Sequence, residues 1–233
     1  MAKLAGYAWT GIMGAIGWPV VFFGNGATLA FGLFWARGVL FISRFFAGVR
    51  WQVTGLENLP EGPFILASKH QSFFDTVVWS QLIPNATYVM KEELLSQPIF
   101  GWFIRHIDVV ALDRKAGLSS LKELLVDSQA KADQGLPVVI FPEGTRTRPG
   151  ERGRYHPGVA AMYEKLNLPV VPVGTDSGVL WDQGLKGLKQ GVITVAIQPA
   201  IQPGLDKRAF LTEVSECIET SSLSLFEQAQ IAG

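Results

Sequence analysis

The feature that most restricts the fold is a long stretch without charge. From Leu4 to Ala36 the chain runs for 33 residues without a single Asp, Glu, Lys or Arg. One continuous helix of that length would measure about 50 Å, well beyond the ~30 Å hydrocarbon core of a bilayer. Pro19 and the Gly24-Asn25-Gly26 run interrupt it. We therefore predict two apolar helices, at 4–23 and 27–49, forming an N-terminal hydrophobic helical hairpin over residues 1–50.

The second predicted helix combines a narrow basic stripe with bulky aromatic residues. Arg37 and Arg44 are seven positions apart and so lie on nearly the same side of a helix. This pattern is typical of helices at a bilayer surface. A cleaved signal peptide and a buried core hairpin are alternatives, but we favour a retained membrane element. Because basic residues flank both ends, the simplest arrangement places both ends on the cytoplasmic side. The aromatic positions are Phe31, Phe34, Trp35, Phe41, Phe45 and Phe46.

The net charge of zero is the sum of two opposed parts. The first acidic residue is Glu57, so the preceding segment carries a charge of +4 and the remainder −4. A neutral chain with 48% hydrophobic and 17% charged residues is neither a disordered chain nor a strongly basic nucleic-acid binder, and we expect no nucleic-acid partner. The single cysteine, Cys217, excludes an intramolecular disulfide framework and a cysteine-cluster metal site.

Beyond residue 50, apolar runs alternate with helical patterns. This alternation predicts an α/β domain over residues 51–233, with a mixed central sheet flanked by helices. The boundary near residue 50 is the one domain boundary that we expect. The predicted strands are 51–55, 63–67, 87–90, 108–112, 137–141, 170–173 and 192–198, and the predicted helices are 73–83, 117–134, 157–167 and 205–230.

A histidine and an aspartate lie across the predicted start of one helix. Ser72 is a candidate N-cap, with Asp75 as the acidic residue of a capping box. The chain could fold His70 back so that Asp75 fixes the imidazole tautomer, leaving the other ring nitrogen to take a proton from a hydroxyl. The alternative is that Asp75 only caps the helix and His70 is incidental.

A second group follows the apolar strand at 137–141. Gly144 permits a tight turn, and the planar guanidinium of Arg146 suits a phosphate. Glu143 could hydrogen-bond hydroxyl groups of a glycerol or sugar. A solvated loop with an ordinary turn glycine is the alternative. Further arginines follow at Arg148, Arg152 and Arg154.

Lys91, after the predicted strand at 87–90, is a further candidate for binding an anion, although an exposed lysine at a helix start explains it equally well. The sequence has no Gly-x-Ser-x-Gly elbow, P-loop, dinucleotide fingerprint or histidine spacing for a metal. The candidate chemistry therefore rests on His70 and the glycine–arginine loop.

In order along the chain, these blocks resemble the bacterial 1-acyl-glycerol-3-phosphate acyltransferases. His70 to Asp75 matches their His-x4-Asp motif, and Phe141 to Arg146 matches their Phe-Pro-Glu-Gly-Thr-Arg block. Lys91–Leu94 with Gly101 and Arg114 matches a second block, and Val170–Val173 a weaker last one.

The resemblance implies roles for these positions. His70 would be the general base and Asp75 its orienting partner, while Lys91 and Arg146 would hold a phosphate. Glu143 and Gly144 would position the glycerol. The implied substrate-binding set is completed by Arg114 and Thr145.

The resemblance also implies a reaction and a location. An acyl group would pass from acyl-CoA or acyl carrier protein to the sn-2 hydroxyl of lysophosphatidic acid, giving phosphatidic acid, without a metal or other cofactor. The enzyme would sit on the cytoplasmic face of the inner membrane, in contact with the lipid bilayer. The alternatives are another acceptor, such as a lysophospholipid, glycerol-3-phosphate or an amino-lipid, and a non-catalytic membrane adaptor.

Overall fold

The computed structural model describes residues 1–113, 117–182 and 187–232. Seven strands form one sheet in the order β1-β7-β6-β2-β5-β3-β4. Strands β2 to β6 are parallel to one another, and β7 runs antiparallel to β6 and parallel to β1. The predicted mixed α/β sheet is therefore confirmed. The strands are β1 (Val49–Thr54), β2 (Ile65–Ser68), β3 (Thr87–Lys91), β4 (Val109–Leu112), β5 (Val138–Ile140), β6 (Val170–Thr175) and β7 (Gly191–Ile197).

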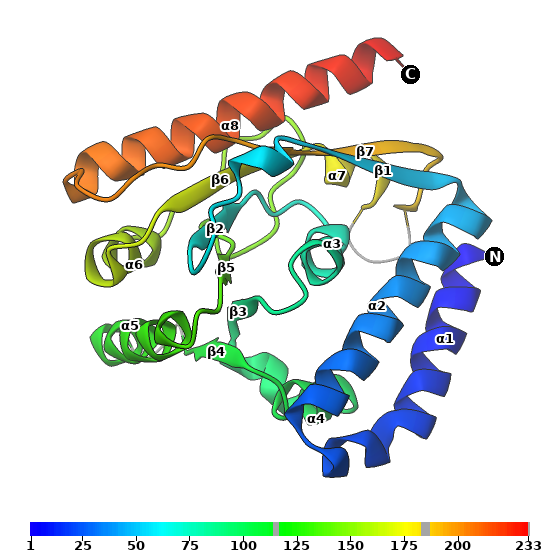
Figure 1. Cartoon of the computed structure of the whole chain (residues 1–233). Helices are drawn as coiled ribbons and strands as arrows, with labels where there is room; N and C mark the ends of the chain where they lie inside the picture. Colours follow the sequence, from blue (N-terminus) through cyan, green and yellow to red (C-terminus); the bar gives the residue numbers. More distant parts are fainter. Residues whose placement is uncertain (114–116, 183–186, 233) are drawn as a thin grey trace.

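Helices cover both faces of this sheet (Figure 1). The longest, α8, runs along one side of the molecule to the C-terminus. The α1–α2 pair, which we call the α1–α2 arm, lies on the other side, where α2 packs against α3 and β1. The α-helices are α1 (Ala2–Gly17), α2 (Asn25–Ala47), α3 (Phe74–Leu82), α4 (Phe100–Ile104), α5 (Leu118–Asp133), α6 (Gly158–Leu166), α7 (Ser177–Leu180) and α8 (Lys207–Ala232). The 3₁₀ helices are η1 (Trp18–Phe23), η2 (Leu56–Asn58) and η3 (Glu92–Ser96).

The alternation of side chains along the strands explains the two layers. In β2, Leu66 packs with α2 and α3, whereas Ile65 and Ala67 pack with α5, α6 and α8 on the opposite face. In β5, Val139 likewise faces the first layer, and Val138 the second. Ile65–Ala67 of β2 and all of β5 are therefore apolar, as expected for strands buried on both faces.

The hairpin is held together at its glycines and tryptophans. A Cβ on Gly38 would lie 2.3 Å from the Trp9 ring, so the ring can pack directly on the backbone of α2. The Trp9 indole N–H donates to the Trp35 carbonyl at 3.0 Å, and the Trp35 N–H donates to the Thr10 hydroxyl at 3.2 Å. Two helices with hardly any charged side chains are thus joined by specific polar contacts.

The first helix is shorter than predicted. We expected a helix over 4–23, but α1 ends at Gly17 and the chain continues as η1. Pro19 has no N–H to donate to the carbonyl four residues earlier, and its ring would collide with that carbonyl. The predicted division into 1–50 and 51–233 stays a prediction, although α2 ends at Ala47 and β1 begins at Val49.

Candidate active site

Parallel strands bring the predicted site residues to one edge of the sheet. Strands β2, β5 and β3 are parallel neighbours, so their carboxyl ends point the same way. His70 follows β2, the Phe141–Arg146 block follows β5, and Lys91 is the last residue of β3. In open α/β sheets this edge is where ligands bind.

His70 and Asp75 meet as predicted. The His70 Nδ1 atom lies 3.3 Å from Asp75 Oδ2. A carboxylate can only accept a hydrogen bond, so this contact assigns the proton to Nδ1 and leaves the Nε2 lone pair free. The His70 ring stacks on Phe141, with 4.1 Å between ring centroids, and remains 15% exposed. The imidazole is therefore oriented from two sides and still accessible.

Asp75 also fixes the backbone around the histidine. Its Oδ2 accepts hydrogen bonds from the N–H groups of Gln71, at 2.6 Å, and Ser72, at 2.8 Å. The carboxylate is thus both a cap for the chain entering α3 and the partner of His70. The two interpretations of the motif are compatible, because one oxygen serves both contacts.

The predicted capping by Ser72 differs in detail. The helix begins at Phe74, and the Ser72 hydroxyl accepts a hydrogen bond from the Phe74 N–H at 3.1 Å. The same hydroxyl donates to Ser177 Oγ at 2.9 Å. This second contact joins the histidine segment to the first residue of α7, which the local sequence could not reveal.

The glycine–arginine loop is bonded to the histidine's own backbone. Gly144 adopts a φ of 65°, and its N–H donates to the Phe141 carbonyl at 2.9 Å, closing the tight turn that we expected. The N–H of Thr147 then donates to the His70 carbonyl at 2.8 Å. Thr145 and Arg146 lie between these two anchors, and their side chains are exposed. The side chains of Arg148, Arg152 and Arg154, further along the chain, are exposed as well.

The structure gives less detail for Lys91 and Arg114, the two other predicted binding residues. Lys91 is half-buried at the end of β3, where it pairs in register with Leu112 of β4. Arg114 lies outside the residues that the structure describes. Within those residues, no group of three or more His, Cys, Asp and Glu side chains could hold a metal ion.

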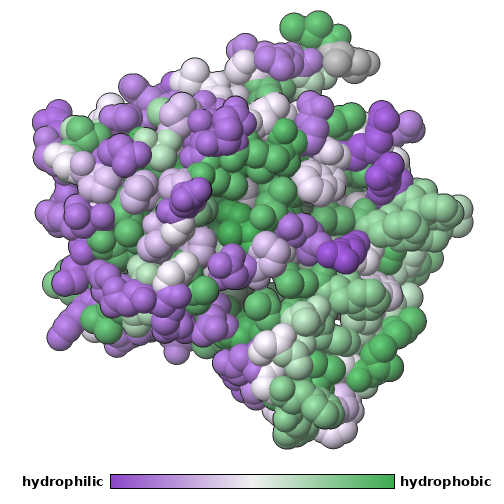
Figure 2. All heavy atoms as spheres, in the orientation of Figure 1, coloured by the Kyte–Doolittle hydropathy of each residue, from purple (hydrophilic) through white to green (hydrophobic). Residues whose placement is uncertain are grey.

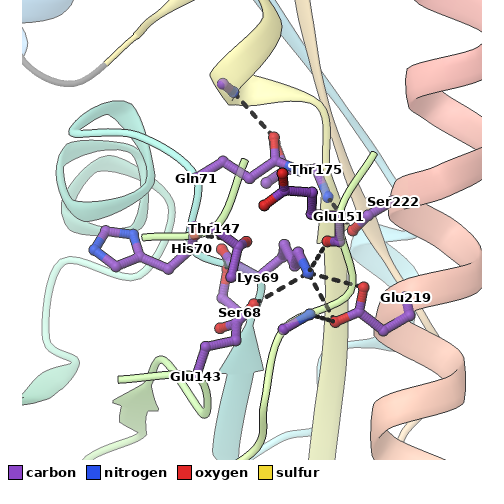
Figure 3. Close-up of polar contacts among 12 residues, drawn as sticks. Ser68, Lys69, His70, Gln71, Glu143, Thr147, Glu151, Thr175, Glu219 and Ser222 are labelled. Carbon is purple, nitrogen blue, oxygen red and sulfur yellow. Dashed lines mark hydrogen bonds and ion pairs between the residues drawn. The ribbon is translucent and has the colours of Figure 1, made fainter. Parts of the chain in front are cut away.

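Glu143 lies in the interior and not on the surface of its loop. Its side chain is 1% exposed, and its Oε1 lies 3.4 Å from the Lys69 ammonium (Figure 3). Burial raises the pKa of Glu143 from 4.5 to about 7, and the nearby Lys69 opposes this rise. Contact between Glu143 and a glycerol hydroxyl stays a prediction.

Sequence reasoning missed two buried charged residues beside the site. Lys69 directly precedes the histidine, and its ammonium bonds to both carboxylate oxygens of Glu219 at 2.7 and 2.8 Å. The two residues are 150 positions apart, so no local pattern connects them. The one available signal for the burial of Glu219 was weak: it follows Ile218, which lies on the buried side of the last helix.

Comparisons with known proteins identify the family. A family model described as "Acyltransferase" matches residues 50–176. A 1-acyl-sn-glycerol-3-phosphate acyltransferase of Pseudomonas aeruginosa is 36% identical over 167 residues, covering 72% of this chain and 65% of that protein. A chloroplastic 1-acyl-sn-glycerol-3-phosphate acyltransferase of Brassica napus is 30% identical over 171 residues, covering 69% of this chain and 49% of that protein. The chain thus spans less than two thirds of the length of these relatives.

The fold is also found in a solved structure. The crystal structure of a 1-acyl-sn-glycerophosphate acyltransferase from Thermotoga maritima matches with a TM-score of 0.67, covering 97% of this chain and 98% of that one at 23% identity. This similarity extends over the α1–α2 arm as well as the sheet. The match to the family model covers more than half of the chain and includes the strands that carry His70, Lys91 and Arg146. The protein therefore belongs to the acyltransferase family.

Proposed function

We propose that the protein transfers a fatty acyl group from a thioester to the sn-2 hydroxyl of 1-acyl-glycerol-3-phosphate, giving phosphatidic acid. The observation that carries this proposal is the His70–Asp75 contact of 3.3 Å beside a loop of exposed arginines that bonds to His70's own carbonyl. A base for the acceptor hydroxyl and cations for its phosphate thus lie on segments that are hydrogen-bonded to each other. The names of the relatives support the choice of acceptor.

In the proposed reaction, the acceptor hydroxyl gives its proton to His70 Nε2 while its oxygen attacks the thioester carbonyl carbon. The new C–O bond forms, the C–S bond breaks, and the thiolate leaves and takes up the proton from the imidazolium. Asp75 stabilises the imidazolium through Nδ1 and keeps the ring oriented. A positioned base of this kind contributes about 10²–10⁴-fold to a rate.

The phosphate of the acceptor would lie on Arg146, with Lys91 and Arg114 as further cations. A guanidinium can bind a phosphate through two parallel hydrogen bonds, which fixes orientation as well as adding affinity. Glu143, Gly144 and Thr145 complete the proposed binding loop. The reaction as proposed uses neither a metal nor a cofactor, because the thioester itself is the activated species. The donor would be acyl-CoA or acyl carrier protein.

The N-terminal hairpin would dock the enzyme on lipid. Phe45 is 71% exposed, and the apolar surface continues over the α1–α2 arm (Figure 2). Among the described residues, α2 is the one helix long and apolar enough to cross a membrane. The basic residues at the ends of the hairpin favour anionic lipid on the cytoplasmic face of the inner membrane. Other exposed apolar side chains of the arm are Leu4, Ile12, Ile16, Trp18, Phe22, Phe23, Phe34 and Phe41.

The proposal is tested with purified protein in mixed micelles, offered a panel of lysolipids and both kinds of thioester, with products read by mass spectrometry. We expect phosphatidic acid from lysophosphatidic acid, and a higher KM for that acceptor in Arg146→Ala. Preferred transfer to an acceptor without a phosphate monoester would replace the proposed acceptor. The absence of transfer to any acceptor would favour a membrane adaptor.

A further inference from the structure

A buried cation stands directly before the proposed base. The Lys69 side chain is 1% exposed, and its ammonium bonds to both oxygens of Glu219 and to the Glu151 carbonyl at 3.3 Å (Figure 3). Taking a charge out of water is costly unless partners replace the lost hydration. Glu219 is the closest carboxylate, at 2.7 Å, and Glu143 is a second one at 3.4 Å.

Glu219 belongs to α8, which lies outside the part of the chain that matches the family model. Besides binding Lys69, its Oε1 accepts a hydrogen bond from the Gly153 N–H at 3.0 Å. Helix α8 can approach so closely because Gly174 of β6 has no side chain: a Cβ there would lie 2.4 Å from Ser221 Oγ. One carboxylate on α8 thus binds both the residue before His70 and the far end of the arginine loop.

The loop from 142 to 154 carries the exposed arginines and has few anchors. Toward its near end Glu143 lies 3.4 Å from the Lys69 ammonium, and Thr147 bonds to the His70 carbonyl. At its far end the Glu151 carbonyl and the Gly153 N–H bond to Lys69 and Glu219. In addition, the Phe226 ring of α8 lies against Gly150, where a Cβ would come within 2.8 Å of it. Removal of both Lys69 and Glu219 would free the far end, would leave Glu143 without its cation, and would leave Thr147 as the main polar attachment.

We propose that Lys69 and Glu219 are positioning residues, and that through this buried pair α8 holds the 142–154 loop in the place where Arg146 meets the acceptor phosphate. This inference rests on the proposed function. Neither residue touches the substrate: both act through the loop. Loss of the pair should therefore weaken binding of the acceptor and leave binding of the thioester unchanged.

The experiment compares Glu219→Leu with the double variant Lys69→Met/Glu219→Leu, with Glu216→Gln as the matched control. Glu216 lies one turn earlier on α8 and is exposed. Hydrogen–deuterium exchange of peptides from residues 142–154 reports the attachment of the loop without any substrate. Steady-state assays give kcat and the KM values for lysophosphatidic acid and for the acyl thioester. Thermal unfolding in the same detergent measures stability.

We expect faster exchange in the 142–154 loop and a roughly 10- to 100-fold higher acceptor KM in both Glu219→Leu variants, because small displacements of a positioning group have effects of this size. The thioester KM should stay within about twofold, as should all values for Glu216→Gln. The double variant should regain most of the unfolding temperature, since apolar side chains can replace a buried ion pair, but it should keep the high acceptor KM.

Two results would overturn the proposal: unchanged exchange in the loop, or an acceptor KM that returns to the wild-type value together with stability in the double variant. The second result would give the pair a structural role alone. If the wild-type protein transferred no acyl group, the proposed function would fail, and the exchange data would still decide whether the pair attaches the loop.

Discussion

The α/β domain and the α1–α2 arm both depart from the usual distribution of side chains, in which charged residues are exposed and large apolar residues are buried. The α/β domain buries charged residues, namely Lys69, Asp75, Glu143, Asp176 and Glu219, whereas the α1–α2 arm exposes phenylalanines such as Phe41, Phe45 and Phe46. Most of the buried charges have partners within the chain. The exposed rings have no comparable cover among the described residues. The buried charges are thus stabilised by contacts within the chain, whereas the exposed phenylalanines need an external partner, for which we propose lipid.

The largest expected effect separates the two regions by function. Replacement His70→Asn keeps a donor for Asp75 but removes the base, so the rate of transfer should fall by about 10²–10⁴-fold. Binding to anionic vesicles, measured by sedimentation, should not change. The matched control is His106→Asn, whose amide can still donate to the Trp102 carbonyl that His106 Nδ1 contacts at 2.7 Å. Equal activity of the two variants would contradict the role of His70.

The second prediction removes one partner of a buried charge. Lys69→Met leaves Glu219 buried without its cation and should lower the free energy of unfolding by about 3–5 kcal/mol. Addition of Glu219→Leu should recover most of that loss. Denaturant unfolding followed by circular dichroism measures both. A single variant as stable as wild type would mean that water already reaches the pair.

The third prediction concerns the arm. Replacement of Phe41, Phe45 and Phe46 by Gln removes three exposed rings, each contributing about 1.5–3 kcal/mol when fully buried in an apolar phase. We expect vesicle partitioning to fall by at least about 100-fold, which is roughly 2.7 kcal/mol. Transfer to a short-chain, micelle-free acceptor should persist. Leu118→Gln with Val126→Gln, on the exposed side of α5, is the control and should bind vesicles like wild type.

The fourth prediction uses the buried acids. The pKa of Glu143 is raised from 4.5 to about 7 and that of Asp176 from 3.8 to about 6, in both cases chiefly by burial. Between the ordinary and the raised pKa, the folded chain keeps a proton that the unfolded chain has lost. Stability should therefore fall as the pH rises from about 4.5 to about 7, by on the order of 1–3 kcal/mol from Glu143. Glu143→Gln should flatten this slope between pH 6 and 7; parallel curves for the two proteins would contradict the assignment.

The sequence predicted elements better than it predicted contacts between them. All seven strands and the His70–Asp75 pair followed from local patterns, because alternation, apolar runs and helix starts are properties of neighbouring residues. The order of the strands in the sheet and the antiparallel direction of β7 depend on contacts between distant segments, so local patterns could not predict them. The short helices α4 and α7 were missed because four or five residues are too few to establish a period.

The candidate site divides in the same way. The turn at Gly144 and the exposure of Arg146 agree with their motif, which is local. The burial of Glu143 and its approach to Lys69 depend on where α8 lies, and α8 reaches the site from the far end of the chain. Hence a sequence motif could name Glu143 but could not predict its surroundings.

The smallest expected effect tests whether burial or distance decides the value of an ion pair. Lys207 and Glu164 approach to 2.7 Å, the same separation as Lys69 and Glu219, but their side chains are 57% and 63% exposed. In water each charge is already solvated, so the pair gains little by meeting, and its loss exposes no unpaired buried group. Lys207→Met should change the free energy of unfolding by less than about 1 kcal/mol, and most of that should vanish in 0.5 M salt. Because the shortest N–O distance is the same in both pairs, a loss as large as that of Lys69→Met would show that distance, and not desolvation, sets the strength of the buried pair.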